Sequence, residues 1–263
     1  MRPGRYGPAK AGHYVLVAFH VLAAFAFFVA VTVVAAAQST ESTSKTTVWQ
    51  GVYTEAQAAR GQTAYASHCT SCHRDDLSGY NSILKGPRFM HNYRESSLNV
   101  LFDKTKTTMP RGAAGTLSDQ TYIDIVAYML KANEFPPGPQ ELRVEDLFKV
   151  QVTGKDGPQE VPNFSLVRVV GCLETNPSNS AWTLTRSTDP ARTGNPQPAA
   201  DERERVENLP LGPMTYHLLV SAAYKPEILK GHKVEVRGFL IRRPTDTRIN
   251  ITSLETLAPS CGQ

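Results

Sequence analysis

Two cysteines and a histidine stand close together in the first third of the chain. They form the run Cys69-Thr70-Ser71-Cys72-His73, in the pattern Cys-x-x-Cys-His. Thiols three positions apart lie on one face of a short helical turn, so both can reach the two vinyl groups of one porphyrin. The histidine that follows is then placed to bind the iron from the proximal side. The pattern therefore predicts one covalently attached c-type haem with His73 as an iron ligand.

A redox-active dithiol of the thioredoxin type also uses the pattern Cys-x-x-Cys. That type of site does not require a histidine directly after the second cysteine. It also lies in a βαβ context, which the sequence around Cys69 does not show. Haem attachment is therefore the favoured interpretation.

A second axial ligand is available in Thr108-Met109-Pro110, 36 residues after His73. A thioether is the usual partner of histidine in electron-transfer haems, and it raises the reduction potential. Because Pro110 disfavours the α conformation for the residue before it, Met109 is expected in an extended loop that presents its side chain to the iron. Four other residues are weaker candidates for ligation or are core positions: His68, Met90, His91 and Met129.

Helices must hold these ligands in place, and the sequence predicts one on either side of them. Thr54 and Gln57 form a capping box for a helix over residues 55–67, which leads directly into the cysteine pair. Ser118 is a good N-cap for a second helix, with Asp119 in its first turn. This second helix has apolar residues at helical spacing and ends before the prolines at 136–137: Ile123, Val126, Ala127 and Leu130.

Residues 49–149 resemble a class I cytochrome c of the bacterial periplasmic type. In that family the first helix carries a glycine and an aromatic residue, here Gly61 and Tyr65, and crosses a last helix that carries an aromatic residue, here Tyr128. The resemblance implies an all-α fold, one haem c per chain, and electron transfer with His73 and Met109 as axial ligands. It covers about 100 residues, roughly two fifths of the chain.

Two positions depart from the family pattern. Ser82 stands where a proline usually helps to hold the proximal histidine, and Arg74 follows His73 where a small residue is usual. These departures leave open which carbonyl group accepts a hydrogen bond from the second ring nitrogen of His73 and so orients the ring. Three cations near the site are candidates for the haem propionates, although solvated side chains are the favoured interpretation: Lys85, Arg88 and Arg111.

The pattern changes to strands after residue 162. Strands are predicted over 164–173, 182–185, 216–220, 232–241 and 248–257, with a helical turn over 225–230 and a long surface loop over 186–212. This order resembles an OB-like β-barrel, with a small sandwich as the alternative. Cys172 and Cys261 remain after haem attachment and are expected to form a disulfide in an oxidising compartment, the alternative being two unpaired thiols.

The N-terminus reads as a targeting segment. Arg2, Arg5 and Lys10 precede an apolar run over residues 14–37 that ends in Ala35-Ala36-Ala37. The predicted organisation is a signal peptide or membrane anchor (1–37), a polar linker (38–50), a cytochrome c domain (51–149), a linker (150–162) and a β-rich OB-like domain (163–263). Positive charge before the apolar run places the remainder outside the cytoplasm, in the periplasm or anchored to the membrane.

Charge argues against nucleic acid as a partner. The whole chain carries a formal net charge of +4, residues 49–149 hold 11 basic and 11 acidic residues, and residues 163–263 hold 12 and 10. Neither part has the basic stripe of a nucleic-acid binder. The sequence thus predicts a non-enzymatic electron carrier, either on its own or as a subunit of a dehydrogenase complex. Its electron donor would be a dehydrogenase or a quinol-oxidising complex, and its electron acceptor would be an oxidase. The alternative function is a haem enzyme, or a gas or redox sensor, with an open iron site.

Overall fold

The computed structural model describes residues 1, 4, 46–79, 83–198 and 202–262. The chain divides into two compact units, Met1–Ser44 and Lys45–Gln263, and all of the helices and strands described below belong to the second. The apolar run over 14–37 and its cleavage site lie outside the described residues. Within the described ranges, no helix is both long and apolar enough to cross a membrane.

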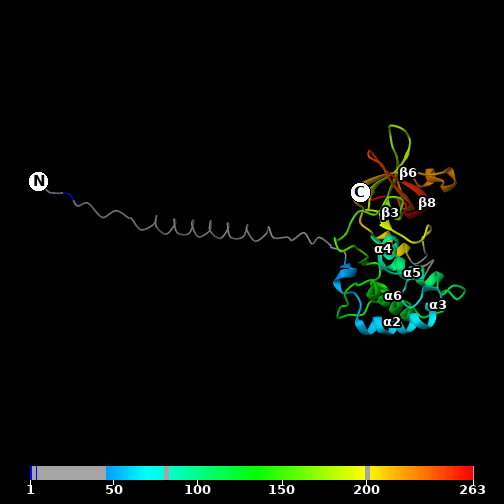
Figure 1. Ribbon diagram of the computed structural model, residues 1–263. Helices are drawn as coiled ribbons and strands as arrows, with labels where there is room; N and C mark the ends of the chain where they lie inside the picture. Colours follow the sequence, from blue (N-terminus) through cyan, green and yellow to red (C-terminus); the bar gives the residue numbers. More distant parts are fainter. Residues whose placement is uncertain (2–3, 5–45, 80–82, 199–201, 263) are drawn as a thin grey trace. The chain divides into compact units, whose positions relative to one another are not determined.

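The first part of the second unit is helical (Figure 1). Its core contains apolar residues from Val48 to Val152. Five helices surround this core: α2 (Glu55–His68), α3 (Thr70–His73), α4 (Gly86–Tyr93), α5 (Leu98–Thr108) and α6 (Asp119–Ala132). Two short 3-10 helices, η2 (Val48–Gln50) and η3 (Val144–Asp146), and two short strands, β1 (Thr46–Thr47) and β2 (Val150–Gln151), lie at its ends.

Helices α2 and α6 pack against each other, as the resemblance to a class I cytochrome c implies. They approach so closely at Gly61 that a Cβ atom there would lie 1.8 Å from the carbonyl oxygen of Asp124. One turn further along, the rings of Tyr65 and Tyr128 are in contact, with centroids 5.1 Å apart. A glycine is therefore required at this crossing, and the aromatic pair packs beside it.

The predicted caps are present, with one difference. The Oγ1 atom of Thr54 accepts a hydrogen bond from the Gln57 amide, and Ser118 Oγ accepts one from Thr121. The Gln57 side chain does not complete a capping box. Instead it donates to the carbonyl of Leu142 and accepts from the Leu142 amide, at 2.9 and 2.8 Å. Gln57 thus joins α2 to the segment after α6.

Two features differ from the predicted helical part. Helices α4 and α5 were not predicted, although Leu98, Leu101, Phe102 and Thr105 recur at helical spacing and are buried. The helical core also reaches into both predicted linkers. Val48 and Val150 are buried in this core, and β1 pairs with β2 in parallel.

The second part is built around a mainly antiparallel sheet. Its elements are β3 (Leu166–Thr175), β4 (Trp182–Ser187), β5 (Ala191–Arg192), α7 (Arg203–Glu207), β6 (Met214–Leu219), η4 (Ala222–Tyr224), η5 (Pro226–Leu229), β7 (Lys233–Arg242) and β8 (Thr247–Ala258). The strand pairings run β4-β6-β8-β7-β3, and β3 pairs again with β4, so five strands form a closed ring. The pair β6–β8 is parallel, and the others in the ring are antiparallel.

The loop predicted over 186–212 contains more structure than expected. It includes the end of β4, strand β5 and helix α7. The fully buried Arg237 of β7 fixes its middle: the guanidinium donates to Thr193 Oγ1 and to the carbonyls of Asn195 and Gln197 at 3.2, 3.1 and 3.0 Å. The same guanidinium pairs with two buried carboxylates, Glu202 and Glu235. These pairs compensate the buried charge, and this part of the loop is fixed on the sheet.

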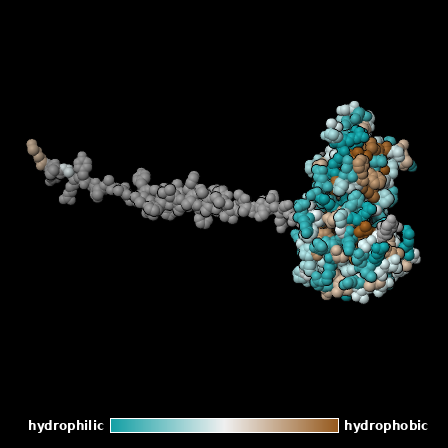
Figure 2. All heavy atoms as spheres, in the orientation of Figure 1, coloured by the Kyte–Doolittle hydropathy of each residue, from teal (hydrophilic) through white to brown (hydrophobic). Residues whose placement is uncertain are grey.

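Cys172 and Cys261 form a disulfide, the pairing expected from the sequence. It joins β3 to the end of the chain across 89 positions, with the two Cα atoms 5.7 Å apart. Most of the large apolar side chains that remain exposed among the described residues belong to this part of the chain: Phe164, Met214, Leu219, Ile228 and Phe239. Figure 2 shows apolar surface over the same part.

Candidate functional site

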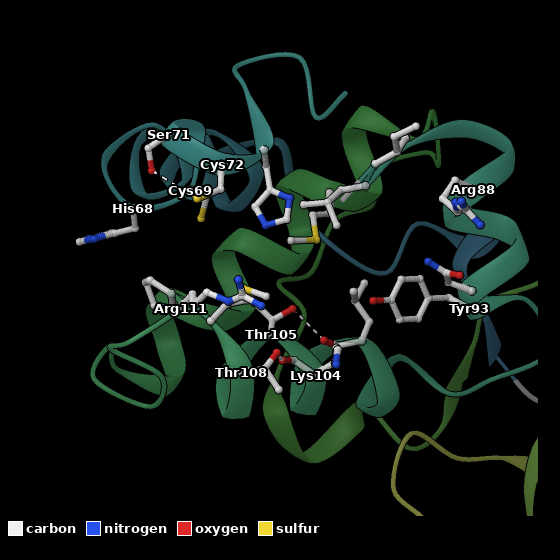
Figure 3. A pocket seen from close by; sticks show the side chains of 18 residues that line it. His68, Cys69, Ser71, Cys72, Arg88, Tyr93, Lys104, Thr105, Thr108 and Arg111 are labelled. Carbon is white, nitrogen blue, oxygen red and sulfur yellow. Dashed lines mark hydrogen bonds between the residues drawn. The ribbon is translucent and has the colours of Figure 1, made fainter. Parts of the chain in front are cut away.

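A cavity of about 750 Å³ opens within the helical part (Figure 3). All four residues singled out from the sequence, Cys69, Cys72, His73 and Met109, line it. The remaining lining residues come from all five helices and the loops between them: His68, Ser71, Ile83, Leu84, Arg88, Asn92, Tyr93, Leu101, Lys104, Thr105, Thr108, Pro110, Arg111 and Met129. The volume lies in the range of small-molecule and cofactor sites, roughly 300–1,000 Å³.

The two thiols and the imidazole are presented by a tight turn between α2 and α3. The Cys69 amide donates to the Tyr65 carbonyl at 2.9 Å and ends α2, and the same residue starts α3. Cys72 is exposed, whereas His73 is buried. Neither Cys69 nor Cys72 is in a disulfide. The turn therefore places both sulfur atoms and the ring of His73 at one cavity.

The protonation of Cys69 argues against a thioredoxin-type site. Burial, with a smaller contribution from Cys72, raises the pKa of the Cys69 thiol to about 11. A nucleophilic cysteine of a dithiol oxidoreductase has a lowered pKa, so that it is a thiolate at neutral pH. Cys69 is instead a neutral thiol in this pocket.

Two contacts hold the end of this turn. The Tyr65 hydroxyl donates to the carbonyl of Arg74 at 2.8 Å, and Arg74 has a positive φ of 60°. The Gly79 amide donates to the His73 carbonyl at 3.0 Å. A Cβ at Gly79 would lie 2.5 Å from the carbonyl oxygen of Cys72, so this position also requires glycine. The role of Gly79 was not predicted, because it arises from a contact with the turn seven residues earlier.

Met109 lies 36 residues after His73 in the sequence, at the end of α5. Its backbone is extended, with φ −130° and ψ 150°, as predicted for a residue before proline. The buried Tyr122 of α6 holds this loop: its hydroxyl donates to the Met109 carbonyl at 2.9 Å and accepts from the Gly115 amide at 3.0 Å. Tyr122 thus fixes the backbone from which the thioether projects.

The cavity combines apolar walls with cations. Leu84, Leu101 and Met129 are apolar, and the charged lining residues are basic: Arg88, Lys104 and Arg111. Among the described lining residues none is acidic. Figure 3 shows Cys69 and Cys72 on one side and Tyr93 on the opposite side, with its hydroxyl directed into the cavity. Burial raises the pKa of Tyr93, so the hydroxyl stays protonated and can donate. This lining fits a large apolar ring that bears carboxylates.

The other sequence candidates divide between the cavity and its surroundings. Arg88 and Arg111 line the cavity, whereas Lys85 lies 3.8 Å from Asp76 in an ion pair and does not. Met129 lines the wall, and His68 is exposed at the rim. Two further candidates, Met90 and His91, are not among the lining residues, and Ser82 lies outside the described residues. Sequence reasoning missed Lys104, Thr105 and Thr108, which the unpredicted helix α5 brings to the site.

Comparison with known proteins supports the same chemistry for the helical part. Residues 56–129 match the family model described as cytochrome C oxidase, cbb3-type, subunit III. Among solved structures, the chain is similar to the sulfane dehydrogenase SoxCD from Paracoccus pantotrophus, with 29% identity and a TM-score of 0.31. That match covers 36% of this chain and 52% of the other, so the chain spans about half the length of that protein; a TM-score this low carries no argument about the fold. No curated protein matches the chain. The family match indicates a c-type cytochrome domain, and with it haem-based electron transfer, in the helical part.

Proposed function

We propose that this protein is a mono-haem c-type cytochrome that carries single electrons between redox partners outside the cytoplasm. One haem c would be bound covalently through Cys69 and Cys72, with His73 and Met109 as axial ligands. The observation that carries the proposal is that the run Cys69 to His73 and Met109, which is 36 residues further along the chain, line one cavity with cationic and apolar walls. The role of each residue follows from its place in that cavity.

The chain's own residues bind the group and control its surroundings. The thiols of Cys69 and Cys72 are the attachment points, and the buried His73 supplies a ring nitrogen. Tyr122 holds the Met109 backbone, so the thioether approaches from a fixed loop. Arg88, Lys104 and Arg111 are the cations available to the carboxylates. The bound haem supplies a one-electron iron couple, whose potential depends on axial ligands, burial and hydrogen bonding.

Ligation by both His73 and Met109 would leave no open iron position. Electron transfer needs none, whereas a haem enzyme or a gas sensor does. The proposal therefore favours a carrier over both of these alternatives.

The compartment and the second part of the chain complete the proposal. The basic and apolar N-terminal sequence supports export, with the segment either cleaved or kept as an anchor. The Cys172–Cys261 disulfide is consistent with an oxidising compartment. The closed ring of five strands, with a short helix between β6 and β7, supports an OB-like barrel, which we propose as a docking or spacer domain.

The proposed partners are drawn from the resemblance to c-type cytochromes and from the matched family model. A donor would be a dehydrogenase or a quinol-oxidising complex. The matched family is described as a subunit of a cytochrome oxidase, which supports an oxidase as acceptor. The same description supports a role as a subunit of a larger redox complex.

The visible spectrum of the haem-loaded protein tests the proposal. Iron–methionine ligation gives the oxidised form a weak far-red absorption band. We expect this band in the wild type, its loss in Met109→Ala, and its retention in Met90→Ala, since Met90 packs in the helical core outside the cavity lining. A wild type without this band that binds CO readily when reduced would instead support an open-site enzyme or sensor.

A further inference from the structure

The haem-pocket wall has a support that belongs to the sheet part of the chain. The joint between α4 and α5, residues 94–97, connects two helices that both line the cavity. Arg192 of β5 reaches this joint: its guanidinium donates to the Arg94 carbonyl at 2.6 Å and, at 3.4 Å, to the carbonyl of His91 in the last turn of α4. The backbone of Ser96 also forms a bridge with that of Arg192.

The position of this guanidinium suits the end of a helix. The last carbonyls of α4 have no partner within the helix and carry the negative end of its dipole. A cation that donates to them satisfies the carbonyls and interacts favourably with the dipole. Glu95, which is 2% exposed, adds an attractive charge next to Arg192, while burial lowers the pKa of Arg192. The guanidinium of Arg192 thus makes its hydrogen bonds to the joint rather than to solvent.

Arg192 is itself held rigidly by the sheet. Strand β5 pairs with β3 through Val167 and Arg168. The next residues, Thr193 to Gln197, receive the hydrogen bonds of the fully buried Arg237. Gly194 also lies close to α5, because a Cβ there would be 3.2 Å from Cγ1 of Val100. A continuous set of contacts therefore connects the core of the sheet to the start of α5, and Met109 directly follows the end of that helix.

We propose that Arg192 is a positioning residue of the haem pocket. Through it, the sheet part of the chain holds the joint between α4 and α5 and so fixes the wall that carries Tyr93, Lys104 and Met109. This inference rests on the proposed function, since it concerns the haem site. It assigns the second part of the chain a role at that site beyond docking or spacing.

The test compares two arginines that make the same kind of bond. Arg186 also donates to backbone carbonyls, those of Cys261 and Gly262, but these lie at the end of the sheet part. In Arg192→Ala we expect amide hydrogen exchange at residues 94–97 to accelerate roughly tenfold, as for the loss of a charge-assisted hydrogen bond. We also expect a shifted reduction potential and a weaker iron–methionine band. Arg186→Ala should match the wild type in all three measurements.

Two milder substitutions of Arg192 test the same inference if Arg192→Ala folds poorly. Arg192→Lys keeps a cation that can donate to Arg94 and should restore most of the potential. Arg192→Gln removes the charge and should resemble the alanine variant. A potential and band that stay unchanged in both Arg192→Ala and Arg192→Gln would overturn the inference, even if exchange accelerates. An equal shift in Arg186→Ala would also overturn it. A failure of the proposed function would be seen separately, as a wild type without covalent haem or without the band.

Discussion

Two buried tyrosines show how differently the same side chain is accommodated in the two parts of the molecule. The hydroxyl of Tyr53 donates to the carbonyl of Phe135 at 2.6 Å in the helical core. The hydroxyl of Tyr216, inside the ring of strands, has no hydrogen-bond partner among the described residues. Burial raises the pKa of both, to about 12 in each case. One hydroxyl is therefore satisfied and the other is not, although both resist ionisation.

Tyrosine-to-phenylalanine substitutions at these two positions should differ at neutral pH. Tyr53→Phe loses a hydrogen bond and leaves the Phe135 carbonyl unpaired, so we expect a loss of about 1 kcal/mol in the free energy of unfolding. Tyr216→Phe removes an unsatisfied buried hydroxyl, so we expect no loss or a small gain. Denaturant unfolding of the two variants measures the difference. Equal destabilisation would show that Tyr216 has a bonding partner.

The same residues give a pH dependence with a definite sign. A folded-state pKa above the unfolded value near 10 means that the native state holds the proton more tightly. This contribution to stability is fully present below about pH 10 and is lost as the pH rises towards 12. The wild type should lose stability across this window, and each phenylalanine variant should lose less. The loss measured from pH 9 to 12 in the double variant, against the wild type, isolates the tyrosine contribution.

Among the elements, the pair α2–α6 is constrained both by a close backbone approach and by ion pairs. Beside the Gly61 contact, Arg60 of α2 bridges Asp124 of α6 at 2.9 Å and Glu141 at 2.8 Å. The hydrogen bonds to Glu141 and Asp124, with a smaller contribution from the charges of the same two carboxylates, raise the pKa of Arg60. The crossing is thus fixed by a backbone contact in its centre and by charges at its edge. The turn that carries Cys69 follows directly from α2, so its position depends on this crossing.

Substitution of Gly61 tests how rigid the crossing is. In Gly61→Ala the new Cβ would meet the Asp124 carbonyl, and the two helices must separate. Alanine favours an isolated helix by about 1 kcal/mol, but overpacking against backbone outweighs this gain. We therefore expect a net loss of about 2 kcal/mol in the free energy of unfolding. Gln62→Ala, on the exposed face of α2, should change it by less than about 0.5 kcal/mol. A neutral Gly61→Ala variant would mean that the crossing adjusts.

The sequence predicted what depends on local pattern. The caps at Thr54 and Ser118 and the main strands of the sheet follow from residue types at fixed spacing, whereas the helix crossing at Gly61 was expected only from the resemblance to a class I cytochrome c. Helices α4 and α5 were missed because α4 is short and α5 begins only five residues after α4 ends. The contact of Arg192 with the joint could not be found in this way, since 98 positions separate it from Arg94. Such contacts depend on the tertiary arrangement of segments that are distant in the sequence.

At the scale of the whole molecule, the described residues form two large hydrophobic cores and a small third cluster of Val170, Val206 and Leu257. One contains residues between Val48 and Val152, the other residues between Val161 and Leu254. The disulfide belongs to the second part alone, where it closes a long segment of chain. Covalent links of this kind stabilise mainly by restricting the unfolded chain. Its effect should therefore be confined to the unfolding of the sheet part.

Replacement of both cysteines tests this separation. In the double variant Cys172→Ala, Cys261→Ala we expect a loss of about 2–5 kcal/mol in the unfolding of the sheet part. The haem spectrum should be unchanged at temperatures where both parts remain folded. Amide hydrogen exchange in the strands and the haem signal, followed together during unfolding, measure the two parts separately. A loss of the haem signal in step with the sheet would show that the two cores unfold as one.

The pairing of β1 with β2 has a consequence for how this chain could be rearranged. Thr46 lies beside Val150, so the helical part starts and finishes at the same place. A domain with adjacent ends tolerates circular permutation, because new termini can be opened in an exposed loop while the old ends are joined. By the same geometry, we expect insertion of the helical part into a loop of another protein to leave the two ends of that loop close together. The adjacent ends of the helical part are thus the feature that circular permutation and domain insertion require.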